Sequence, residues 1–240
     1  MSNEWIPLYI KPTGLRVKIF GGGSVAARRA RLFSNAGAEV QVFAIEFSSE
    51  LKEMERQGKV KLYQIDLRYA DLDKMLQNVD IIVIAVDDEE LARIVSRKAT
   101  EKGKLVNNAV NALEGNVIVP YRGKTSYGLY IATTSLGATG VAARRTLERL
   151  LKILEEDSYY KTLFIVMSRV KKYLKERVPN PKIRFKANLA ADAEEKVHQL
   201  AEQGHVEDAY EIALGAALKT VDTSSDPAGK QVTPSLEESR

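Results

Sequence analysis

Short apolar runs alternate with amphipathic segments along the first half of the chain. Five runs are rich in β-branched and aromatic residues, and they cover residues 16–20, 39–45, 60–65, 80–86 and 104–110. Between most of them, apolar residues recur at helical spacing, as in residues 25–37 and 89–103. Gly37 and Gly103 stand where a residue of positive φ commonly closes a helix. The alternation predicts an α/β fold, with a doubly wound parallel sheet over residues 1–113.

The pattern changes after this sheet. Residues 116–135 hold two apolar runs on either side of a polar, glycine-containing turn, which is typical of a β-hairpin. Residues 139–154 then repeat leucine and other apolar residues at helical spacing. Two half-covered strands and a leucine-rich helix exceed what one small sheet can hide. We therefore expect residues 114–155 to form the interface of a homodimer.

The rest of the chain is predicted to be mostly helical. A helical pattern covers residues 159–177, stops at Pro179-Asn-Pro181, and returns over residues 187–219 with a break at Gly204. These segments define a helical C-terminal domain over residues 156–220.

Composition narrows the possible chemistry. The chain has no cysteine and only two histidines, which excludes disulfides, thiolate metal sites and histidine-rich metal sites, so we expect no bound metal. The net charge of +4 is modest and interleaved with acids, which favours a solvated surface over nucleic-acid binding. No signal-peptide pattern and no run of ~20 apolar residues is present, so we expect a cytoplasmic protein without a membrane partner. Residues 221–240 have the composition of a disordered tail.

Three consecutive glycines join the first apolar run to the first helical pattern. Gly21, Gly23 and Ala26 satisfy the G-x-G-x-x-[G/A] spacing between a predicted strand and a predicted helix. Gly21 permits a tight turn, a side chain at Gly23 would collide with a pyrophosphate, and Ala26 lets helix and strand approach. Free N–H groups of the first helical turn would face the anion. This favours a Rossmann-like dinucleotide site over the alternative, a merely structural turn.

Glu46 follows the second predicted strand, 23 residues after Gly23. NAD-specific sites commonly place an acid here, beside the adenosine ribose. No arginine stands within the next few positions to bind a 2′-phosphate. We therefore expect NAD rather than NADP as the cofactor. The alternative for Glu46 is an ordinary solvated loop acid.

Three segments of the chain resemble the precorrin-2 dehydrogenase family, the dehydrogenase modules of siroheme synthesis, some of which also insert iron. The segments are GGGSVAARRARLFSNAGAEVQVFA, VDIIVIAVDDEELARIVSRKA and VNNAVNALEGNVIVPYRGKTSYGLYIATTSLGATGVAARRTLERLL. The likeness covers roughly residues 5–155, with the motifs in the right order and spacing. It implies a homodimer that binds NAD and a tetrapyrrole substrate.

The glycine motif and the resemblance together give a set of cofactor-contacting positions. They are Gly21, Gly22, Gly23, Ser24, Val25, Ile45, Glu46 and Asp87. Asp88 completes the family's Asp-Asp pair at the end of the fourth strand, where ligands of open α/β sheets bind. Either aspartate could instead cap the helix that begins at Glu89.

The catalytic segment departs from the family pattern. The family's V-N-V-V-D segment, whose aspartate is taken as the general acid/base, reads Val106-Asn-Asn-Ala-Val110 here, so the carboxylate is missing. Asn108 and Asn111 can form hydrogen bonds, but an amide cannot relay a proton as a carboxylate does. We expect these asparagines to orient substrate or water, with Asp88 as the reserve candidate for the base.

The implied substrate carries many carboxylates, which basic side chains would bind. The candidates on the hairpin and the following helix are Arg122, Lys124, Arg144 and Arg145. The alternative for each is a solvated surface charge. The family's S-x-G-G-x-S-P turn reads TSLGATG at residues 134–140, which keeps Ser135 as a further substrate contact.

The resemblance implies NAD-dependent oxidation of precorrin-2 to sirohydrochlorin. The missing aspartate motivates a second hypothesis, a catalytically weakened NAD-binding homologue that acts as a binding or regulatory partner in tetrapyrrole synthesis. A nucleotide-binding protein of unrelated function is the least favoured alternative, since fold does not fix function. We disfavour iron chelation, because neither the family aspartate nor any histidine within the first 197 residues is present to accept pyrrole protons.

Overall fold

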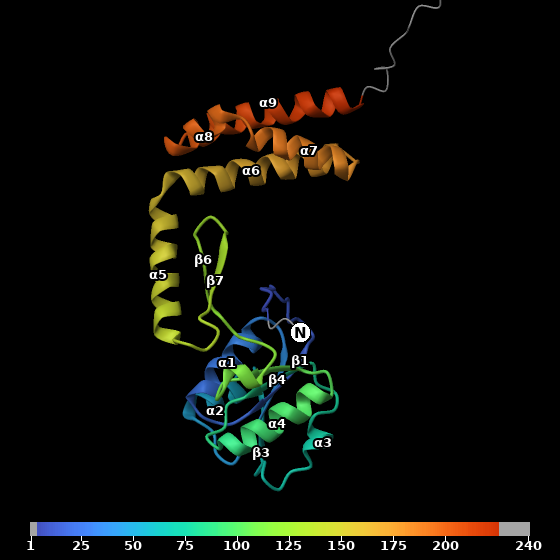
Figure 1. Ribbon diagram of the computed structural model, residues 1–240, viewed down its shortest axis with the longest axis vertical. Coiled ribbons are helices and arrows are strands. Elements are labelled where there is room, and N and C mark those ends of the chain that lie inside the picture. Colours follow the sequence, from blue (N-terminus) through green and yellow to red (C-terminus); the bar gives the residue numbers. More distant parts are fainter. Residues whose placement is uncertain (1–3, 226–240) are drawn as a thin grey trace, which may run out of the picture. The chain divides into compact units, whose positions relative to one another are not determined.

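Figure 1 shows a computed structural model of the chain, which describes residues 4–225. The chain separates into two compact units. The first takes in the chain up to Tyr121 together with Thr134–Ala143, and the second takes in Arg122–Thr133 and the chain from Arg144 onward. The hairpin-plus-helix region expected at residues 114–155 is therefore shared between the two units.

Five parallel strands form the sheet of the first unit. They are β1 (Arg16–Phe20), β2 (Glu39–Ala44), β3 (Lys61–Gln64), β4 (Ile81–Ile84) and β5 (Leu105–Asn108). Their order is β3-β2-β1-β4-β5, so the direction of winding reverses between β1 and β4. The predicted α/β, Rossmann-like fold is confirmed. In such a sheet, ligands bind at the carboxyl ends of the strands beside this reversal.

Helices cover both faces of the sheet. They are α1 (Ser24–Asn35), α2 (Ser49–Arg56), α3 (Leu72–Met75) and α4 (Glu89–Glu101), with a short 3-10 helix η1 (Ala112–Glu114) after β5. One core cluster joins β1 and β2 to α1 and α2, and another joins β1 and β4 to α4. Burial on both faces explains why β4 reads as a continuous apolar run. Gly37 and Gly103 have φ of 88° and 69°, as predicted for residues that close helices.

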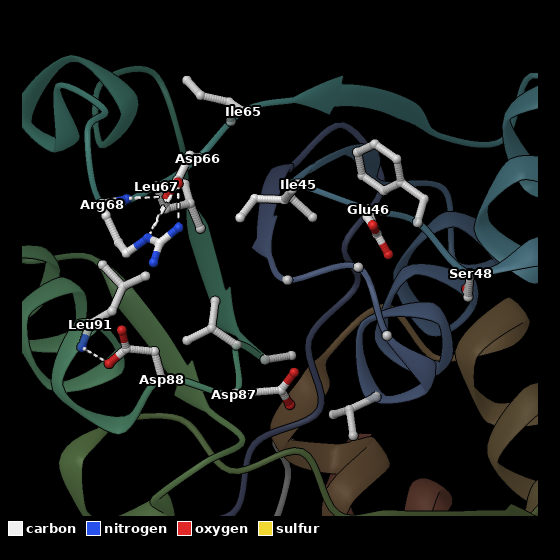
Figure 2. Close-up of a pocket in the computed structure, with 18 of the residues that line it drawn as sticks. Ile45, Glu46, Ser48, Ile65, Asp66, Leu67, Arg68, Asp87, Asp88 and Leu91 are labelled. Atoms are coloured by element: carbon white, nitrogen blue, oxygen red, sulfur yellow. Dashed lines mark hydrogen bonds and ion pairs between the residues drawn. The ribbon is translucent and has the colours of Figure 1, made fainter.

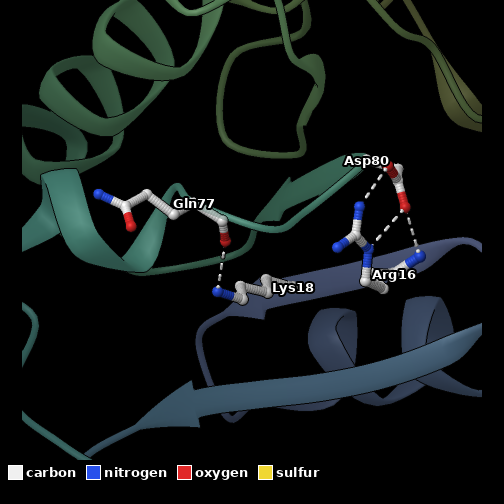
Figure 3. A network of polar contacts seen from close by, with 4 residues as sticks. All are labelled: Arg16, Lys18, Gln77 and Asp80. Atoms are coloured by element: carbon white, nitrogen blue, oxygen red, sulfur yellow. Dashed lines mark hydrogen bonds and ion pairs between the residues drawn. The ribbon is translucent and has the colours of Figure 1, made fainter.

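Polar contacts tie the amino end of β1 to the segment before β4 (Figure 3). The backbone N–H of Arg16 donates to Asp80 at 2.8 Å, and its guanidinium donates to both carboxylate oxygens at 3.2 Å. The Lys18 ammonium donates to the backbone carbonyls of Met75 and Gln77, at 2.8 and 3.0 Å. Burial is the main cause that lowers the pKa of Lys18. These two carbonyls accept hydrogen bonds from the partly buried Lys18 ammonium, which therefore has polar partners without a carboxylate.

The second unit is a hairpin and a set of helices. The hairpin strands are β6 (Tyr121–Lys124) and β7 (Tyr130–Thr133), as predicted, and the helices are α5 (Gly140–Glu156), α6 (Ser158–Arg177), α7 (Pro181–Asp192), α8 (Glu195–Glu202) and α9 (Val206–Ser225). The hairpin turn is fastened to the end of α5, since the Tyr127 hydroxyl donates to the Leu154 carbonyl at 3.2 Å. Within residues 4–225, no helix is both long and apolar enough to cross a bilayer.

The C-terminal region differs from the prediction in three places. Helix α7 begins at Pro181 rather than near residue 187, because the Asn180 side chain caps it and proline suits the first helical position. A second break, at Ala193 and Glu194, precedes the predicted break at Gly204. Helix α9 runs to Ser225, past the expected start of a disordered tail at residue 221, because its buried face continues the core cluster. The rest of that predicted tail lies outside the described residues.

Candidate functional site

An open cavity of about 810 Å³ lies at the carboxyl edge of the sheet (Figure 2). Its wall is built by the segments that follow the first four strands and by the first turns of α1 and α4. All the residues predicted to contact a cofactor line it, namely Gly21, Gly22, Gly23, Ser24, Val25, Ile45, Glu46 and Asp87. The volume falls in the range of small-molecule sites, about 300–1,000 Å³.

The three glycines of the loop are needed for different reasons. Gly21 has φ of 118°, and a Cβ there would overlap the carbonyl of Ala85. A Cβ at Gly22 would overlap the carbonyl of Glu46. Apart from its chain neighbours, a Cβ at Gly23 would meet no atom of residues 4–225 within 4 Å, yet Gly23 lines the cavity. The fold itself therefore requires the first two glycines, whereas the third leaves room for a ligand.

The first turn of α1 is open to an anion. Gly23 precedes the helix and offers no side-chain cap, and the first turn holds no acidic residue. By contrast, α2 is capped by Ser48 and α4 by Asp88. The uncapped N–H groups of α1, at the cavity residues Ser24 and Val25, are the arrangement that binds a pyrophosphate.

Residues after β2 and β3 form opposite sides of the cavity. Figure 2 shows Ile45 and Glu46 on one side and Leu67 and Arg68 on the other. Ile45 is 50% exposed, although it is apolar. The Arg68 guanidinium donates to the carboxylate of Asp66, from Nε at 2.9 Å and from Nη2 at 2.6 Å, and these hydrogen bonds are the main cause that lowers the pKa of Asp66. An apolar wall facing a fixed guanidinium suits a purine ring.

The two aspartates after β4 differ in their partners. Asp88 accepts a hydrogen bond from the Leu91 N–H at 2.9 Å and so caps α4, which was one of the two roles considered for it. Asp87 makes no hydrogen bond or ion pair with any residue in the described part of the chain. Both side chains are exposed and line the cavity.

Asn108 and Asn111 have structural partners within the turn after β5. Asn108 is buried, and its Oδ1 accepts from the backbone N–H groups of Val110 and Asn111, at 2.9 and 3.0 Å. The Asn111 side chain accepts from the Leu113 N–H at 3.2 Å and caps η1. Neither asparagine lines the cavity.

The residues predicted to bind substrate are divided between the two units. Ser135 belongs to the first unit, where its hydroxyl oxygen accepts from the Thr139 N–H at 2.8 Å. Arg122, Lys124 and Arg144 belong to the second unit. Arg144 lies 3.7 Å from Glu148 on its own helix. Arg145, also in the second unit, lies 3.2 Å from Glu148. None of the five lines the cavity.

Together, the winding reversal, the glycine loop and the uncapped helix define a dinucleotide-binding domain. A family model described as "Putative NAD(P)-binding" matches residues 8–121. The chain is 30% identical over 186 residues to a precorrin-2 dehydrogenase of Methanosarcina barkeri, with 76% of this chain and 80% of that protein covered. It is 34% identical over 151 residues to a siroheme synthase of Chromobacterium violaceum, with 63% and 31% covered.

A solved structure described as SirC, precorrin-2 dehydrogenase shares the fold. The TM-score is 0.59 at 21% identity, with 91% of this chain and 98% of that chain covered. The chain belongs to the precorrin-2 dehydrogenase family.

Proposed function

We propose that this chain is an NAD-dependent dehydrogenase that oxidises precorrin-2 to sirohydrochlorin. The observation that carries the proposal is Gly23. Its missing side chain serves no contact within the protein, but it leaves the cavity open at the uncapped start of α1. Family membership supplies the substrate class, since a relative that this chain covers to 80% is named a precorrin-2 dehydrogenase.

The residues present fit the cofactor. The N–H groups at Gly23, Ser24 and Val25 would hold the pyrophosphate. The Glu46 carboxylate, which lines the cavity after β2, would accept hydrogen bonds from the ribose hydroxyls and repel a 2′-phosphate. Ile45 would pack against the adenine. When bound, NAD supplies the hydride acceptor, so the chain itself has to position the macrocycle and receive a proton.

The proton acceptor must come from the strand ends. Val110 occupies the family aspartate's position, and Asn108 and Asn111 are held in a turn. Asp87 and Asp88 remain at the end of β4, and Asp88 uses one carboxylate oxygen for its cap. We propose this pair as the source of the base. Because this pair stands on another strand than the family aspartate, we expect it to replace that base only in part, and turnover to be slow; complete loss of a general base typically costs about 10²–10⁴-fold in rate.

The test is an anaerobic assay of precorrin-2 with NAD that follows the absorbance of sirohydrochlorin. Wild type and Val110→Asp are compared. Turnover by wild type supports the dehydrogenase. Turnover by Val110→Asp alone would instead support the second candidate, a weakened homologue that binds the cofactor, which the valine at position 110 favours. Turnover by neither variant, with NAD still bound, would contradict precorrin-2 as the substrate.

We also propose that the chain is a homodimer. Apolar side chains are exposed along α5, among them Val141 at 67%, Leu150 and Ile153. Exposed apolar residues that gather on one helix suit an interface between two copies.

A further inference from the structure

Arg29 is a half-buried arginine of α1 that has no acidic partner in the described part of the chain. Its Nε donates to the side-chain oxygen of Asn107 in β5, at 3.2 Å. Among the carboxylates of residues 4–225, none lies within ion-pair distance of this guanidinium, whereas Arg31 on the same helix pairs with Glu50. Burial, followed by the neighbouring charge of Arg28, lowers the pKa of Arg29. Partial burial of a cation without an anion is unfavourable, and an anionic ligand would offset that cost.

The terminal nitrogens of Arg29 are open to a ligand. Neither Nη1 nor Nη2 makes a hydrogen bond with another described residue. No described side-chain nitrogen is both fully buried and without a partner, so these two nitrogens reach solvent. A guanidinium with both terminal nitrogens available can grip a carboxylate through two parallel hydrogen bonds.

Asn107 fixes the direction of the guanidinium. It is buried, and its amide nitrogen donates to the backbone carbonyl of Val117 at 3.0 Å. That bond turns its oxygen toward Arg29. Asn107 is therefore a positioning residue, and the arginine, not the asparagine, is available to a ligand.

The phenol of Tyr121 lies beside this arginine. Tyr121 is close enough to Arg29 to raise the pKa of the guanidinium slightly against the effect of burial. The Tyr121 hydroxyl in turn lies 3.0 Å from where a Cβ of Gly140 would stand, at the start of α5. The first unit thus places a phenol beside the guanidinium, outside the cofactor cavity.

We propose that Arg29, oriented by Asn107, binds a carboxylate of the tetrapyrrole substrate. This rests on the proposed function, which supplies a substrate with several carboxylates. The cofactor is a poorer candidate for the anion, because Arg29 does not line the cavity that would hold it. Arg29 stands six residues after Gly23, about 9 Å along the helix. Helix α1 would therefore hold the cofactor at its first turn and the substrate along its side.

The test compares Arg29→Met, Arg29→Gln and Arg29→Lys with Arg28→Met, a control at an exposed position of the same helix. Three quantities are measured: binding of sirohydrochlorin by absorbance titration, KM and kcat for precorrin-2, and binding of NAD by calorimetry. Removal of a charged hydrogen-bonding group should weaken sirohydrochlorin binding and raise KM by about 10–100-fold. NAD binding and kcat should change little. Arg29→Lys should recover part of the loss, and Arg28→Met should behave as wild type.

The outcomes distinguish a failure of the Arg29 proposal from a failure of the proposed dehydrogenase function. If wild type turns over precorrin-2 and Arg29→Gln, which can still hydrogen-bond to Asn107, keeps the same KM and sirohydrochlorin affinity, the inference is overturned and the function stands. Equal losses in NAD and sirohydrochlorin binding would also overturn it, since they would mark a structural role. If wild type neither binds sirohydrochlorin nor turns over precorrin-2, the proposed function fails and the inference falls with it.

Discussion

The side-chain oxygen of Asn108 accepts a hydrogen bond from the backbone N–H of Asn111 at 3.0 Å. The same oxygen accepts from the N–H of Val110, so one buried amide organises the whole turn after β5. Position 110, where the family aspartate would stand, is thus held by its neighbour's side chain.

Asn108→Ala should lower the free energy of unfolding by about 1–3 kcal/mol, because it removes the buried acceptor of two hydrogen bonds, each worth about 0.5–1.5 kcal/mol. Asn111→Ala should cost less, since Asn111 caps only the three-residue η1. Urea unfolding measures both. If Asn108→Ala is no less stable than Asn111→Ala, the two hydrogen bonds to the Asn108 oxygen do not hold the turn.

Gly23→Asp should abolish NAD binding and leave the fold intact. The new Cβ would meet no described atom within 4 Å beyond its chain neighbours, and aspartate is a favourable residue before a helix, so stability should stay level or rise by a few tenths of a kcal/mol. Gly22→Ala is the matched contrast, because its Cβ would overlap the Glu46 carbonyl and destabilise the fold. Calorimetry and thermal unfolding distinguish the two. Tight NAD binding by Gly23→Asp would refute the placement of the pyrophosphate.

Asp88 has a structural role and a proposed chemical role, which two variants can separate. Asp88→Asn should keep the cap on α4, since asparagine caps as well as aspartate, whereas Asp88→Ala should lose about 1 kcal/mol of stability. If Asp88 accepts the proton, both variants should lose about 10²–10⁴-fold in turnover. Asp87→Asn tests the neighbouring carboxylate in the same assay. Unchanged turnover in both asparagine variants would remove the pair from the mechanism.

Asp80 should contribute to the loss of stability in acid. Hydrogen bonds from Arg16 hold the pKa of Asp80 below its ordinary value of 3.8. A lowered pKa in the folded state stabilises the fold above pH 3.8, and this contribution is lost as the pH falls through the lowered value. In urea unfolding at pH 6 and pH 3, Asp80→Asn should therefore show a smaller drop between the two pH values than wild type. An equal drop would show that the carboxylate plays no part in acid unfolding.

Val141→Glu should convert the proposed homodimer to a monomer, because it places a charge on an apolar residue that is 67% exposed in the single chain. Light scattering at micromolar concentration gives the oligomeric state. Lys152→Glu, a charge change at an already exposed polar position of α5, is the control. A monomeric wild-type chain would contradict the proposal directly.

Sequence patterns predicted the sheet and the glycine loop because both are encoded locally. Strands buried on two faces read as apolar runs, and the glycines follow one strand directly. The environments of Asn108 and Asn111 could not be predicted in the same way, because an amide that organises a turn has the same sequence signal as one that contacts a ligand. The start of α7 was missed because Pro181 reads both as a helix breaker and as a first helical residue.

Residues joined across the fold were also beyond sequence reasoning. Arg29 and Asn107 are 78 positions apart, and only the packing of α1 against the sheet brings them together. The approach of Arg68 to the cavity depends on the strand order, which sets the end of β3 next to that of β2. If that strand order had been assumed, Asp66 and Arg68 after β3 could have been predicted to lie at the cavity.

The unequal demands on the three loop glycines bear on how this family can diverge. A descendant that stopped using the cofactor would still be bound to keep Gly21 and Gly22, because its own backbone excludes any other residue there. Position 23 would be free to change, since no atom in the described part of the chain opposes a Cβ there. The triple glycine as a whole therefore indicates only descent from a cofactor-binding ancestor. Its third glycine alone indicates that the cofactor is still bound. This chain retains that third glycine even though it has exchanged the family aspartate for a valine.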